Sequence, residues 1–520
     1  MMLAQAHMDQ NSMRLKALVR GWVEIPDEWD RQLNGIALDS RSVRPGSIFL
    51  ACPGHISHGL LHARSAIDAG ASAVLYDMPP AGFDLKALSG SADVPVIPVA
   101  GLKQLLGPIA ARFYGDPSAN RVVIGVTGTN GKTSCCHYLA QLWSELDQGC
   151  VVMGTLGNGR WSSPRGELEL VSGSGRTTPD AVAVQAELAR FDCPVVAMEV
   201  SSHGLDQGRV NGVAFAGAVF TNLTRDHLDY HATMEGYAEA KLRLFRNASL
   251  KWVAVNLDDD FGQKVADEAP DTAQVVVYGV NSSPQSLAEA HGWQWLWARS
   301  IDSSTAGAAL AIESSWGQID LHTTLMGRFN VSNVLAAMGI LLLSGARWEA
   351  VTAGVARLGP VRGRMERFGG GDRPLVVVDY AHTPDALEQV LKNLREYTTG
   401  RLICVFGCGG DRDAGKRPQM GKIAERYADH VIVTDDNPRF EDGDEIIKAI
   451  LGGMFDPTSV GIERDREVAI QLGLREAEPG DIVLVAGKGH EIGQEVSGRV
   501  YPFSDRQLVS NCLGVANPHV

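Results

Sequence analysis

The sequence lacks the features that mark secreted, membrane-embedded or nucleic-acid-binding proteins. Its eight cysteines include no C-x-x-C pair, so we expect reduced, mostly buried thiols rather than a zinc site or a disulfide framework. No apolar run reaches the roughly 18 residues that a membrane span needs, and the first residues lack the apolar core of a signal peptide. A formal net charge of −14 argues against the basic surface that broad nucleic-acid binding requires. We therefore expect a cytoplasmic protein without membrane insertion and without a nucleic-acid partner.

What the chain does contain is an alternation of short, β-branched apolar runs with helical patterns over most of its 520 residues. Such alternation is typical of parallel sheets covered by helices, so we predict an α/β fold. The runs that we expect to form strands are Val122–Val126, Val195–Val200, Ala218–Thr221, Trp252–Asn256, Leu375–Asp379, Leu402–Phe406, Val431–Thr434 and Ile482–Ala486.

The length suggests two to four domains, and two turn-rich segments indicate where they join. These segments are YGDPSAN (Tyr114–Asn120) and LGPVRGR (Leu358–Arg364). We predict a small α/β N-terminal domain at 1–117, a central parallel-sheet domain with a phosphate-binding loop at 118–358, and a Rossmann-like C-terminal domain at 359–520.

Polar clusters follow the apolar runs at the points where the strands should end. In open α/β sheets, ligands bind beyond the carboxyl ends of the strands, and strand interiors need none of these groups. We therefore predict that the clusters build a binding site. They are Gly128–Thr133, Glu199–His203, Thr221–His227, Asp379–His382, Gly407–Arg412, Asp435–Arg439 and Gly487–Glu491.

The segment VTGTNGKTS (Val126–Ser134) is the first of these clusters. Glycines followed by Lys-Thr at a helix start can wrap backbone N–H groups around phosphates. Lys132 would then lie against the β- and γ-phosphates, and the Thr133 hydroxyl would bind Mg²⁺. Val126 stands where the common loop has its first glycine, and the alternative is a glycine-rich turn with a solvated lysine. The predicted nucleotide-binding residues of the loop are Gly128, Thr129, Asn130, Gly131, Lys132, Thr133 and Ser134.

The loop GTNGKT resembles that of the Mur ligases and of their relative folylpolyglutamate synthase. These ATP-dependent ligases activate a carboxylate as an acyl phosphate, which an amine then attacks. MEVSSHGLDQGR (Met198–Arg209) and TNLTRDHLDYH (Thr221–His231) look like the next two family blocks. The resemblance implies that Glu199 and His227 share Mg²⁺ with the nucleotide phosphates. Either residue alone would be interpreted as a polar residue at a strand end.

Further blocks resemble the family's catalytic and nucleotide-binding segments. In YAEAKLRLF, the resemblance implies that Lys241 is carbamylated and helps to hold a second Mg²⁺; without the family it would be a surface lysine on an amphipathic helix. In MGRFNVSNVLAA, it implies that Asn333, beside Asn330, approaches the nucleotide, although Asn330 or Ser332 could instead cap the following helix. The blocks GRMERF and DYAHTPDAL place Arg364 near the phosphates, Asp379 at the ribose, and Tyr380 and His382 near adenine or phosphate.

The N-terminal segment LDSRSVRPGSIFLACPG (Leu38–Gly54) resembles the uridine-diphosphate-binding domain of the tripeptide-forming member of the family. There the resemblance implies that Ser40 and Arg41 contact the uridine diphosphate; by themselves they belong to a polar turn. The block GRTTPD (Gly175–Asp180) resembles the segment that holds the muramyl peptide. The residues implied for that substrate are Thr177, Thr178, Ser201, Gln207 and Arg209.

The segment DDNPRFED (Asp435–Asp442) contains D-N-P-R, which the family associates with meso-diaminopimelate rather than L-lysine. A guanidinium at Arg439 can bind the extra carboxylate of diaminopimelate in a bidentate manner. In isolation the motif would be a tight turn after a strand. After AGKGHE the chain reads IGQE, where we expect DYQ. The residues implied for diaminopimelate are Arg412, Asp436, Asn437, Pro438 and Arg439, with Gly487 and Glu491 at its distal ammonium.

The resemblance implies a monomeric enzyme that joins meso-diaminopimelate to UDP-N-acetylmuramoyl-L-alanyl-D-glutamate, using ATP and Mg²⁺. Lys132 and Lys241 would be catalytic, and His203, near Ser201, would be a candidate proton acceptor. Three alternatives stay open at this point. A folylpolyglutamate synthase would lack the uridine domain and D-N-P-R, a lysine-adding ligase would lack only D-N-P-R, and a nucleotide-binding regulatory module would lack the chemistry.

Overall fold

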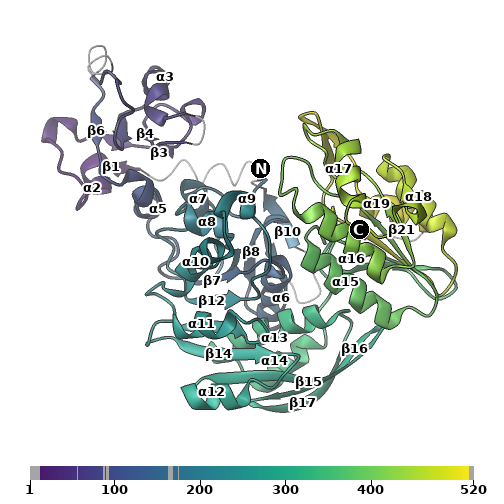
Figure 1. Ribbon diagram of the computed structural model, residues 1–520. Helices are drawn as coiled ribbons and strands as arrows, with labels where there is room; N and C mark the ends of the chain where they lie inside the picture. The colour runs from purple at the N-terminus through teal and green to yellow at the C-terminus, as the bar shows by residue number, and fades with distance from the viewer. Residues whose placement is uncertain are drawn as a thin grey trace. The chain divides into compact units, whose positions relative to one another are not determined.

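The computed structural model describes residues 12–54, 57–85, 88, 93–161, 168–173 and 175–514. The chain falls into two compact units, each made of several segments. Unit one comprises Met1–Gly125, Val151–Arg160 and Leu170–Ala216, and unit two comprises Val126–Cys150, Trp161–Glu169 and Gly217–Val520. Both units combine sheets with helices, which confirms the predicted α/β class (Figure 1).

Unit one begins with a pair of short strands and a parallel sheet of order β3-β4-β5-β6. Its elements are β1 (Met13–Arg14), α2 (Leu15–Val19), β2 (Gln32–Leu33), β3 (Gly35–Ala37), β4 (Ser47–Ala51), α3 (Ala63–Asp68), β5 (Ala73–Tyr76), β6 (Val96–Pro98) and α5 (Leu102–Phe113). On β4, Ile48 and Leu50 pack in the cluster that contains α5, whereas Phe49 packs in the cluster that contains α3. The sheet is therefore buried on both faces, as parallel sheets usually are.

The remainder of unit one carries strands in the order β10-β9-β8-β11. Its elements are β8 (Cys150–Gly154), β9 (Gly157–Trp161), β10 (Leu168–Ser172), α7 (Ala181–Arg190), β11 (Val195–Glu199) and α8 (Ser202–Asp206). Helix α5 packs against α7. The backbone at Gly107 lies so close to Asn211 that an added Cβ would be 1.7 Å from its carbonyl oxygen. This close approach requires glycine on α5.

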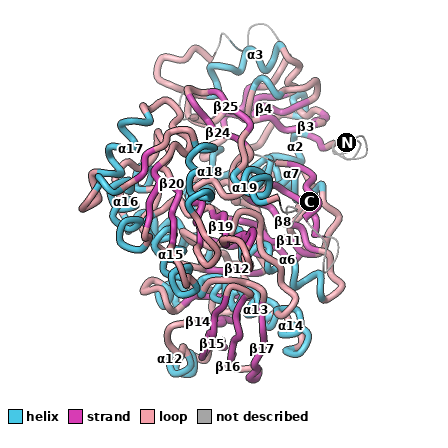
Figure 2. Tube along the Cα trace, turned by 90° about the vertical axis from the view of Figure 1, so that its right-hand side faces the viewer, coloured by secondary structure: helices cyan, strands magenta, loops and turns pink. Residues whose placement is uncertain are grey.

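Unit two begins where β7 (Val122–Thr127) leads into α6 (Lys132–Glu145). Strands β12 to β15 pair in parallel, and β15 to β17 continue as an antiparallel meander (Figure 2). Helix α13 is almost entirely buried because it packs against both α6 and the strands. The elements are β12 (Gly217–Phe220), α9 (Leu228–His231), α10 (Met234–Phe245), β13 (Trp252–Asn256), α11 (Gly262–Asp267), β14 (Gln274–Gly279), α12 (Gln285–His291), β15 (Gln294–Ser304), β16 (Gly307–Ser314), β17 (Gly317–Thr323), α13 (Arg328–Leu343) and α14 (Trp348–Val355).

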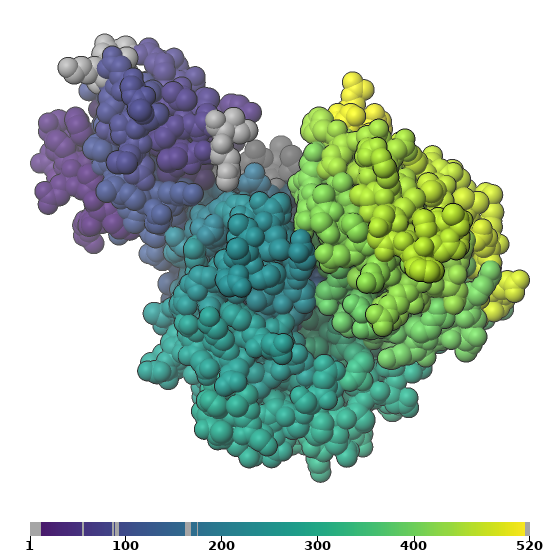
Figure 3. Space-filling model, in the orientation of Figure 1, coloured from purple at the N-terminus to yellow at the C-terminus, as the bar shows by residue number. Residues whose placement is uncertain are grey.

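The last part of unit two is a second sheet, of order β18-β19-β23-β20-β21-β22. Its strands β19, β23, β20, β21 and β22 are parallel to one another. One face packs against α15, α16 and α17, and the other against α18 and α19, so the sheet is doubly wound. Its atoms, green to yellow, are closely packed in Figure 3. The elements are β18 (Glu366–Gly369), β19 (Leu375–Asp379), α15 (Pro384–Tyr397), β20 (Leu402–Phe406), α16 (Lys416–Tyr427), β21 (His430–Val433), α17 (Gly443–Leu451), β22 (Gly461–Ile462), α18 (Arg466–Glu476), β23 (Ile482–Ala486), β24 (Gly493–Val496), β25 (Arg499–Pro502) and α19 (Asp505–Leu513).

Each of the eight predicted strands is present, with ends within one residue of those expected. The three domain boundaries stay predictions. All eight cysteines lie among the described residues as free thiols, six of them buried, as the spacing indicated. Within the described ranges, no helix is both long and apolar enough to cross a membrane.

Candidate active site

The loop between β7 and α6 has the backbone of a phosphate-binding turn. Gly131 takes a φ of 88° directly before the first residue of α6. A Cβ on Gly128 would lie 1.8 Å from Thr221 Oγ1, and a Cβ on Gly131 would lie 2.5 Å from Asn333 Oδ1. Lys132 Nζ donates to the carbonyl oxygens of Gly128 and Thr129, at 2.8 Å each. The loop therefore combines a helix N-terminus with a lysine folded over it, which suits an anion.

The segment after β12 holds this loop in place. Asn222 accepts twice: its backbone oxygen from Thr129 N and its side-chain oxygen from Asn130 N, both at 2.9 Å. Thr221 Oγ1 donates to the carbonyl of Asn130 at 2.6 Å, and Thr224 N donates to Thr129 Oγ1 at 3.0 Å. We singled out this segment for metal binding from its sequence and missed its role as a scaffold.

Helix α10 brings Lys241 close to the loop. Tyr237 Oη lies 3.2 Å from Thr129 Oγ1, and Lys241 Nζ lies 4.2 Å from the centre of the Tyr237 ring. Lys241 is 1% exposed, so the interpretation as a surface lysine is wrong. Burial, together with the nearby Lys132 ammonium, holds the pKa of the Lys241 amine well below its ordinary value of 10.5. A neutral amine is the form that can react with carbon dioxide to give a carbamate.

His227 lies in the same region, at the start of α9. It adopts a φ of 54°, a left-handed conformation that is uncommon for residues other than glycine. Its ring centre is 6.1 Å from that of Tyr237, and its Nε2 is 3.3 Å from Asp226 Oδ2. His227 is thus beside the α10 residues that support the loop, and Asp226 is a buried acid that we did not predict from the sequence.

The block that leads into β18 reaches the loop from the second sheet of unit two. Arg364 Nη2 donates to Thr133 Oγ1 at 3.1 Å, and its guanidinium lies 4.5 Å from the centre of the Tyr380 ring. Asp379 Oδ2 accepts from Met365 N at 2.7 Å. Burial raises the pKa of the Asp379 carboxyl to about 6. The predicted nucleotide residues from both sheets therefore meet at the start of α6.

Two further side chains join this cluster. Lys416 Nζ donates to the carbonyl of His382 at 2.8 Å, and His382 Nδ1 lies 2.8 Å from the carbonyl of Tyr380. Burial and the Lys416 ammonium lower the pKa of His382 to about 4, so the imidazole is neutral. The Tyr380 ring centre is 4.9 Å from that of His490. Lys416 was missed from the sequence, and His490 lies in the predicted cluster Gly487–Glu491 but was given no role there.

Asn333 and Asn330 lie inside α13, which begins at Arg328 after Gly327. The alternative that Asn330 or Ser332 caps this helix is therefore wrong. Asn330 instead bridges two elements, because its Nδ2 donates to the Met326 carbonyl at 2.8 Å and its Oδ1 accepts from Tyr138 Oη at 3.1 Å. Asn333 Oδ1 faces Gly131 and accepts from the Cys135 thiol at 3.4 Å.

In unit one, Glu199 lies at the end of β11 and is 1% exposed. Its two oxygens accept from Thr155, from the backbone N–H at 2.8 Å and from the hydroxyl at 3.1 Å. The Thr155 hydroxyl is also 3.0 Å from Thr177 Oγ1. An added Cβ on Gly154 would be 2.2 Å from Glu199 Oε1. Glu199 is therefore a fixed, buried carboxylate next to a predicted peptide-binding residue.

The other residues predicted for the muramyl peptide form one connected group in unit one. Thr178 Oγ1 donates to the Glu199 carbonyl at 2.9 Å and accepts from Ser201 N at 3.0 Å. Arg209 Nη1 donates to the Thr178 carbonyl at 2.7 Å, and Arg209 Nε donates to Gln207 Oε1 at 3.0 Å. Ser201 caps α8, which places His203 in the first turn of that helix.

Ser40 and Arg41 lie in a single turn of 3₁₀ helix, Ser40–Ser42. Arg41 is exposed and folds back on Asp39, with Nε 2.9 Å from Oδ1. This hydrogen bond lowers the pKa of Asp39 to about 2. The turn lies between β3 and β4, and the Arg41 side chain is 89% exposed, so the guanidinium is accessible to an anionic ligand.

The D-N-P-R loop follows β21 and lies against the segment that follows β23. Arg439 takes a φ of 54°, and its Nε donates to Glu495 Oε2 at 3.1 Å while its Nη1 donates to the Gly410 carbonyl at 2.7 Å. A Cβ on Gly409 would be 2.9 Å from Arg439 Nη1 and 3.9 Å from Arg412 Cγ. The two predicted carboxylate-binding arginines therefore approach the same glycine.

The remaining residues predicted for the amino acid also come together there. A Cβ on Gly487 would lie 2.7 Å from Asp436 Oδ2, and Glu491 Oε2 accepts from Asn437 Nδ2 at 3.0 Å. The Pro438 carbonyl accepts from Glu441 N at 3.1 Å, so the turn expected from the sequence is also present. Glu495 lies in the stretch that departs from the family pattern, and it supplies a partner for Arg439.

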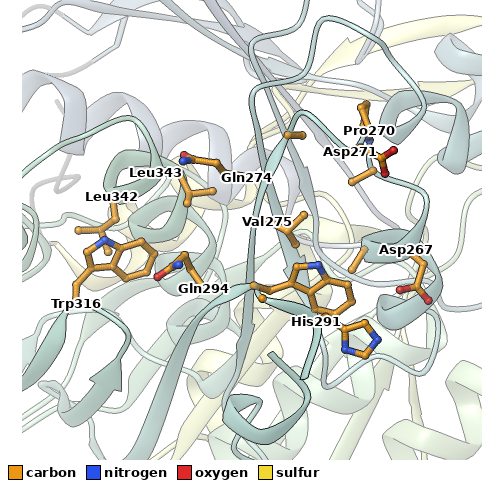
Figure 4. Close-up of a pocket in the computed structure, with 15 residues that line it drawn as sticks. Asp267, Pro270, Asp271, Gln274, Val275, His291, Gln294, Trp316, Leu342 and Leu343 are labelled. Atoms are coloured by element: carbon orange, nitrogen blue, oxygen red, sulfur yellow. The ribbon is translucent and has the colours of Figure 1, made fainter. Parts of the chain in front are cut away.

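A pocket elsewhere in unit two contains none of the predicted site residues. It is lined by Asp267, Gln274, His291, Gln294, Trp316 and neighbouring residues (Figure 4). Gln274 and Gln294 are the first residues of β14 and β15. The pocket therefore lies at the amino ends of the parallel strands, opposite the edge where ligands of such sheets bind.

The donors proposed for Mg²⁺ are of types that the ion accepts beside a nucleotide. Mg²⁺ at such sites takes one or two protein ligands and fills its remaining positions with phosphate oxygens and water. Among the described residues, no group of three or more His, Cys, Asp or Glu side chains could hold a metal.

Comparison with known proteins identifies the family. The Mur ligase family catalytic domain matches residues 32–114, the Mur ligase middle domain 126–341, and the Mur ligase glutamate ligase domain 363–489. A UDP-N-acetylmuramoyl-L-alanyl-D-glutamate–2,6-diaminopimelate ligase of Pseudomonas aeruginosa is 48% identical over 491 residues, which cover 94% of this chain and 96% of the relative. A ligase of the same name from Chromobacterium violaceum is 46% identical over 487 residues, with 92% and 94% covered. The chain belongs to the Mur ligase family.

A solved structure of a ligase with that name covers 97% of this Mur ligase and 99% of its own chain, at 36% identity and a TM-score of 0.66. The predicted family and its three-part α/β architecture are therefore confirmed. In this Mur ligase the middle-domain match contains the phosphate loop, and the glutamate ligase match contains D-N-P-R.

Proposed function

We propose that this Mur ligase joins meso-diaminopimelate to UDP-N-acetylmuramoyl-L-alanyl-D-glutamate in peptidoglycan precursor synthesis, with conversion of ATP to ADP and phosphate. The observation that carries this function is the likeness to ligases of that name along more than nine-tenths of the chain. The same likeness disfavours a folylpolyglutamate synthase and a module without chemistry. The D-N-P-R loop disfavours a lysine-adding ligase.

The loop Gly128–Thr133 and the first turn of α6 would hold the ATP phosphates. Backbone N–H groups at the helix start and the Lys132 ammonium favour negative charge there. Arg364, which already contacts Thr133, would reach the same phosphates. Asp379, Tyr380, His382 and Asn333 surround this point in unit two and are the proposed contacts of ribose and adenine.

The residues of unit one would hold the UDP-muramoyl dipeptide. Ser40 and Arg41 are proposed for the diphosphate, with Arg41 exchanging Asp39 for a phosphate oxygen. The connected group of Thr177, Thr178, Ser201, Gln207 and Arg209 offers hydroxyl, amide and guanidinium groups, which suit a substrate rich in amides and carboxylates. The D-glutamate carboxylate would be the group presented to ATP.

In the first chemical step, the D-glutamate side-chain carboxylate attacks the γ-phosphorus and the bond to ADP breaks. Lys132 stabilises the charge that develops on the phosphoryl oxygens, so the step depends mainly on positioning and electrostatics. Thr133, Glu199 and His227 would hold Mg²⁺, and carbamylated Lys241 would help to hold a second Mg²⁺, which together would neutralise phosphate charge. The burial of Lys241, which lowers the pKa of its amine and so favours the neutral form, supports the proposed carbamate.

In the second step, the amine of diaminopimelate attacks the acyl phosphate, and phosphate leaves through a tetrahedral intermediate. The amine must be neutral to attack, and His203 in the first turn of α8 is our candidate for the proton acceptor. Arg439 and Arg412 would bind the distal carboxylate of diaminopimelate, and Gly487 and Glu491 its distal ammonium. Asp436, Asn437 and Pro438 complete that subsite. We also propose that the enzyme is a cytoplasmic monomer.

Phosphate release tests this function. The purified chain is given ATP, Mg²⁺ and the UDP-muramoyl dipeptide, with meso-diaminopimelate in one reaction and L-lysine in another. We expect release with diaminopimelate alone. Release with lysine would keep the ligase but contradict the role of D-N-P-R. If neither reaction releases phosphate although the protein is folded and still binds ATP, the result would favour a folylpolyglutamate synthase or a non-catalytic nucleotide-binding module.

A further inference from the structure

Lys488 is a buried charge that the mechanism above does not use. It lies in AGKGHE, directly after β23, and its side chain is completely buried. Its ammonium donates to Asn437 Oδ1 at 2.9 Å and to Glu491 Oε2 at 2.7 Å. A buried ammonium is costly unless it is paired and hydrogen-bonded, so both contacts are needed to hold it there. Both partners belong to the proposed amino-acid subsite.

Asn437 closes a three-membered group with the same two side chains. Its Nδ2 donates to Glu491 Oε2 at 3.0 Å, and its Oδ1 accepts from Glu495 N at 2.8 Å as well as from Lys488. Both the oxygen and the nitrogen of the Asn437 amide are therefore hydrogen-bonded, and a flip of the amide would break these hydrogen bonds. The D-N-P-R loop and the segment after β23 are joined through this group.

The group fixes one oxygen of Glu491 and leaves the other open to a ligand. Within the described part of the chain, the hydrogen bonds that reach the Glu491 carboxylate end on Oε2. The Glu491 side chain is 29% exposed, whereas Lys488 behind it is 0% exposed. A carboxylate held through Oε2 has its rotamer already set, which lowers the entropy cost of binding a cation.

We propose that Lys488 is a positioning residue that orients Glu491 to accept the distal ammonium of the amino-acid substrate. This inference rests on the proposed function, since it assigns Glu491 to diaminopimelate. Loss of the Lys488 charge would also make the electrostatic potential at Glu491 more negative, and this change by itself favours binding of an ammonium. Because Glu491 is partly exposed, water and salt screen that gain, and the loss of orientation is expected to prevail.

The test is steady-state kinetics of Lys488→Met with two amino acids, meso-diaminopimelate and 2-aminopimelate. The second keeps the distal carboxylate but lacks the distal amine. We expect the KM for diaminopimelate to rise about tenfold, the scale on which outer partners of a binding group act. The kcat at saturation, the KM for ATP and kcat/KM for 2-aminopimelate should each stay within about twofold. A merely structural role would instead weaken both amino acids alike.

The matched control is Lys448→Met, which removes an exposed lysine–glutamate pair of the same three-residue spacing, Lys448 and Glu445, 3.5 Å apart. It should change none of these constants. If Lys488→Met does not fold, Lys488→Gln decides, because it keeps an N–H donor for the same partners; its KM for diaminopimelate should rise less. Equal losses for both amino acids, or an unchanged KM for diaminopimelate, would overturn the inference. A parent enzyme that is silent with diaminopimelate would overturn the proposed function, and the inference with it.

Discussion

At the scale of single residues, the site depends on polar groups that the fold buries at some cost. Asp379 is buried and accepts from Met365 N, yet the surrounding apolar strand disfavours its ionised form. Lys241 is likewise buried, beside Tyr237, and burial with the nearby Lys132 ammonium lowers the pKa of its amine well below 10.5. Shifted pKa values of this kind are common at functional sites, where a protein needs a group in a particular protonation state.

Asp379 therefore makes folding stability depend on pH. Its pKa is about 6 in the folded state against 3.8 ordinarily, so between these values the folded state holds a proton that the unfolded state releases. Stability should fall as pH rises through this window, by about 3 kcal/mol in total. Asp379→Asn removes this pH-dependent loss of stability, and the asparagine oxygen can still accept the hydrogen bond from Met365 N. We expect urea unfolding to show the variant gaining stability relative to the parent as pH rises from 3.8 to about 6, and a constant difference above that window.

The control is Asp372→Asn, at an exposed aspartate close in sequence. The free energy of unfolding of Asp372→Asn should change with pH in the same way as that of the parent. A constant difference between Asp379→Asn and the parent across the range would contradict the assigned pKa shift, whatever its size. ATP binding by Asp379→Asn should weaken if the carboxylate holds the ribose.

At the scale of elements, the eight strands predicted from the sequence are buried strands of the two larger sheets, and no strand of the antiparallel meander was among them. Runs such as Leu375–Asp379 are buried along their whole length and read as continuous apolar stretches. Strands β15 to β17 alternate buried and exposed residues over long stretches, with polar residues such as Ser303 and Asp320 between apolar ones. Polar residues in an exposed strand face resemble those of loops, so these strands carried no distinct signal.

The depth of a helix was equally hard to predict. The pattern of α10 indicates an amphipathic helix, but it does not say what covers the face that contains Lys241. The structure covers it with Tyr237 and the phosphate loop, contacts between segments about a hundred residues apart in the chain. Lys416 was missed for the same reason, because its partner lies in another loop. Family resemblance located Lys241 where the pattern alone could not.

The turn between β7 and α6 supports a prediction about backbone geometry. Gly128 has a φ of 155° and leaves no room for a Cβ, which would lie 1.8 Å from Thr221 Oγ1. Gly128→Ala should shift the loop by about an ångström and lower kcat/KM for ATP by about a hundredfold, the scale of such misplacements in an active site. Phosphate release at varied ATP measures this. Gly292→Ala, at a φ of 71° with open space around it, is the control and should affect only stability, by about 1 kcal/mol. Equal turnover in both variants would contradict the assignment of the loop.

At the scale of the whole molecule, the proposed subsites divide between the two units. The residues proposed for ATP phosphates, nucleoside and diaminopimelate belong to unit two, whereas those proposed for the UDP-muramoyl dipeptide belong to unit one. Only Glu199, among the proposed metal ligands, belongs to unit one. A single substrate should therefore protect one set of segments from exchange with solvent and leave the other set unchanged.

Hydrogen exchange followed by mass spectrometry can test this division on the full chain. A non-hydrolysable ATP analogue with Mg²⁺ should slow exchange at 126–134, 221–225 and 363–382, because ligand binding suppresses local opening where it contacts the backbone. The UDP-muramoyl dipeptide should slow exchange at 38–44 and 175–209. Peptides from 267–275, which line the pocket at the opposite strand ends, serve as the internal control. Protection of 267–275 by the ATP analogue, with no change at 126–134, would place the nucleotide at the wrong edge of the sheet for every role assigned to Lys132.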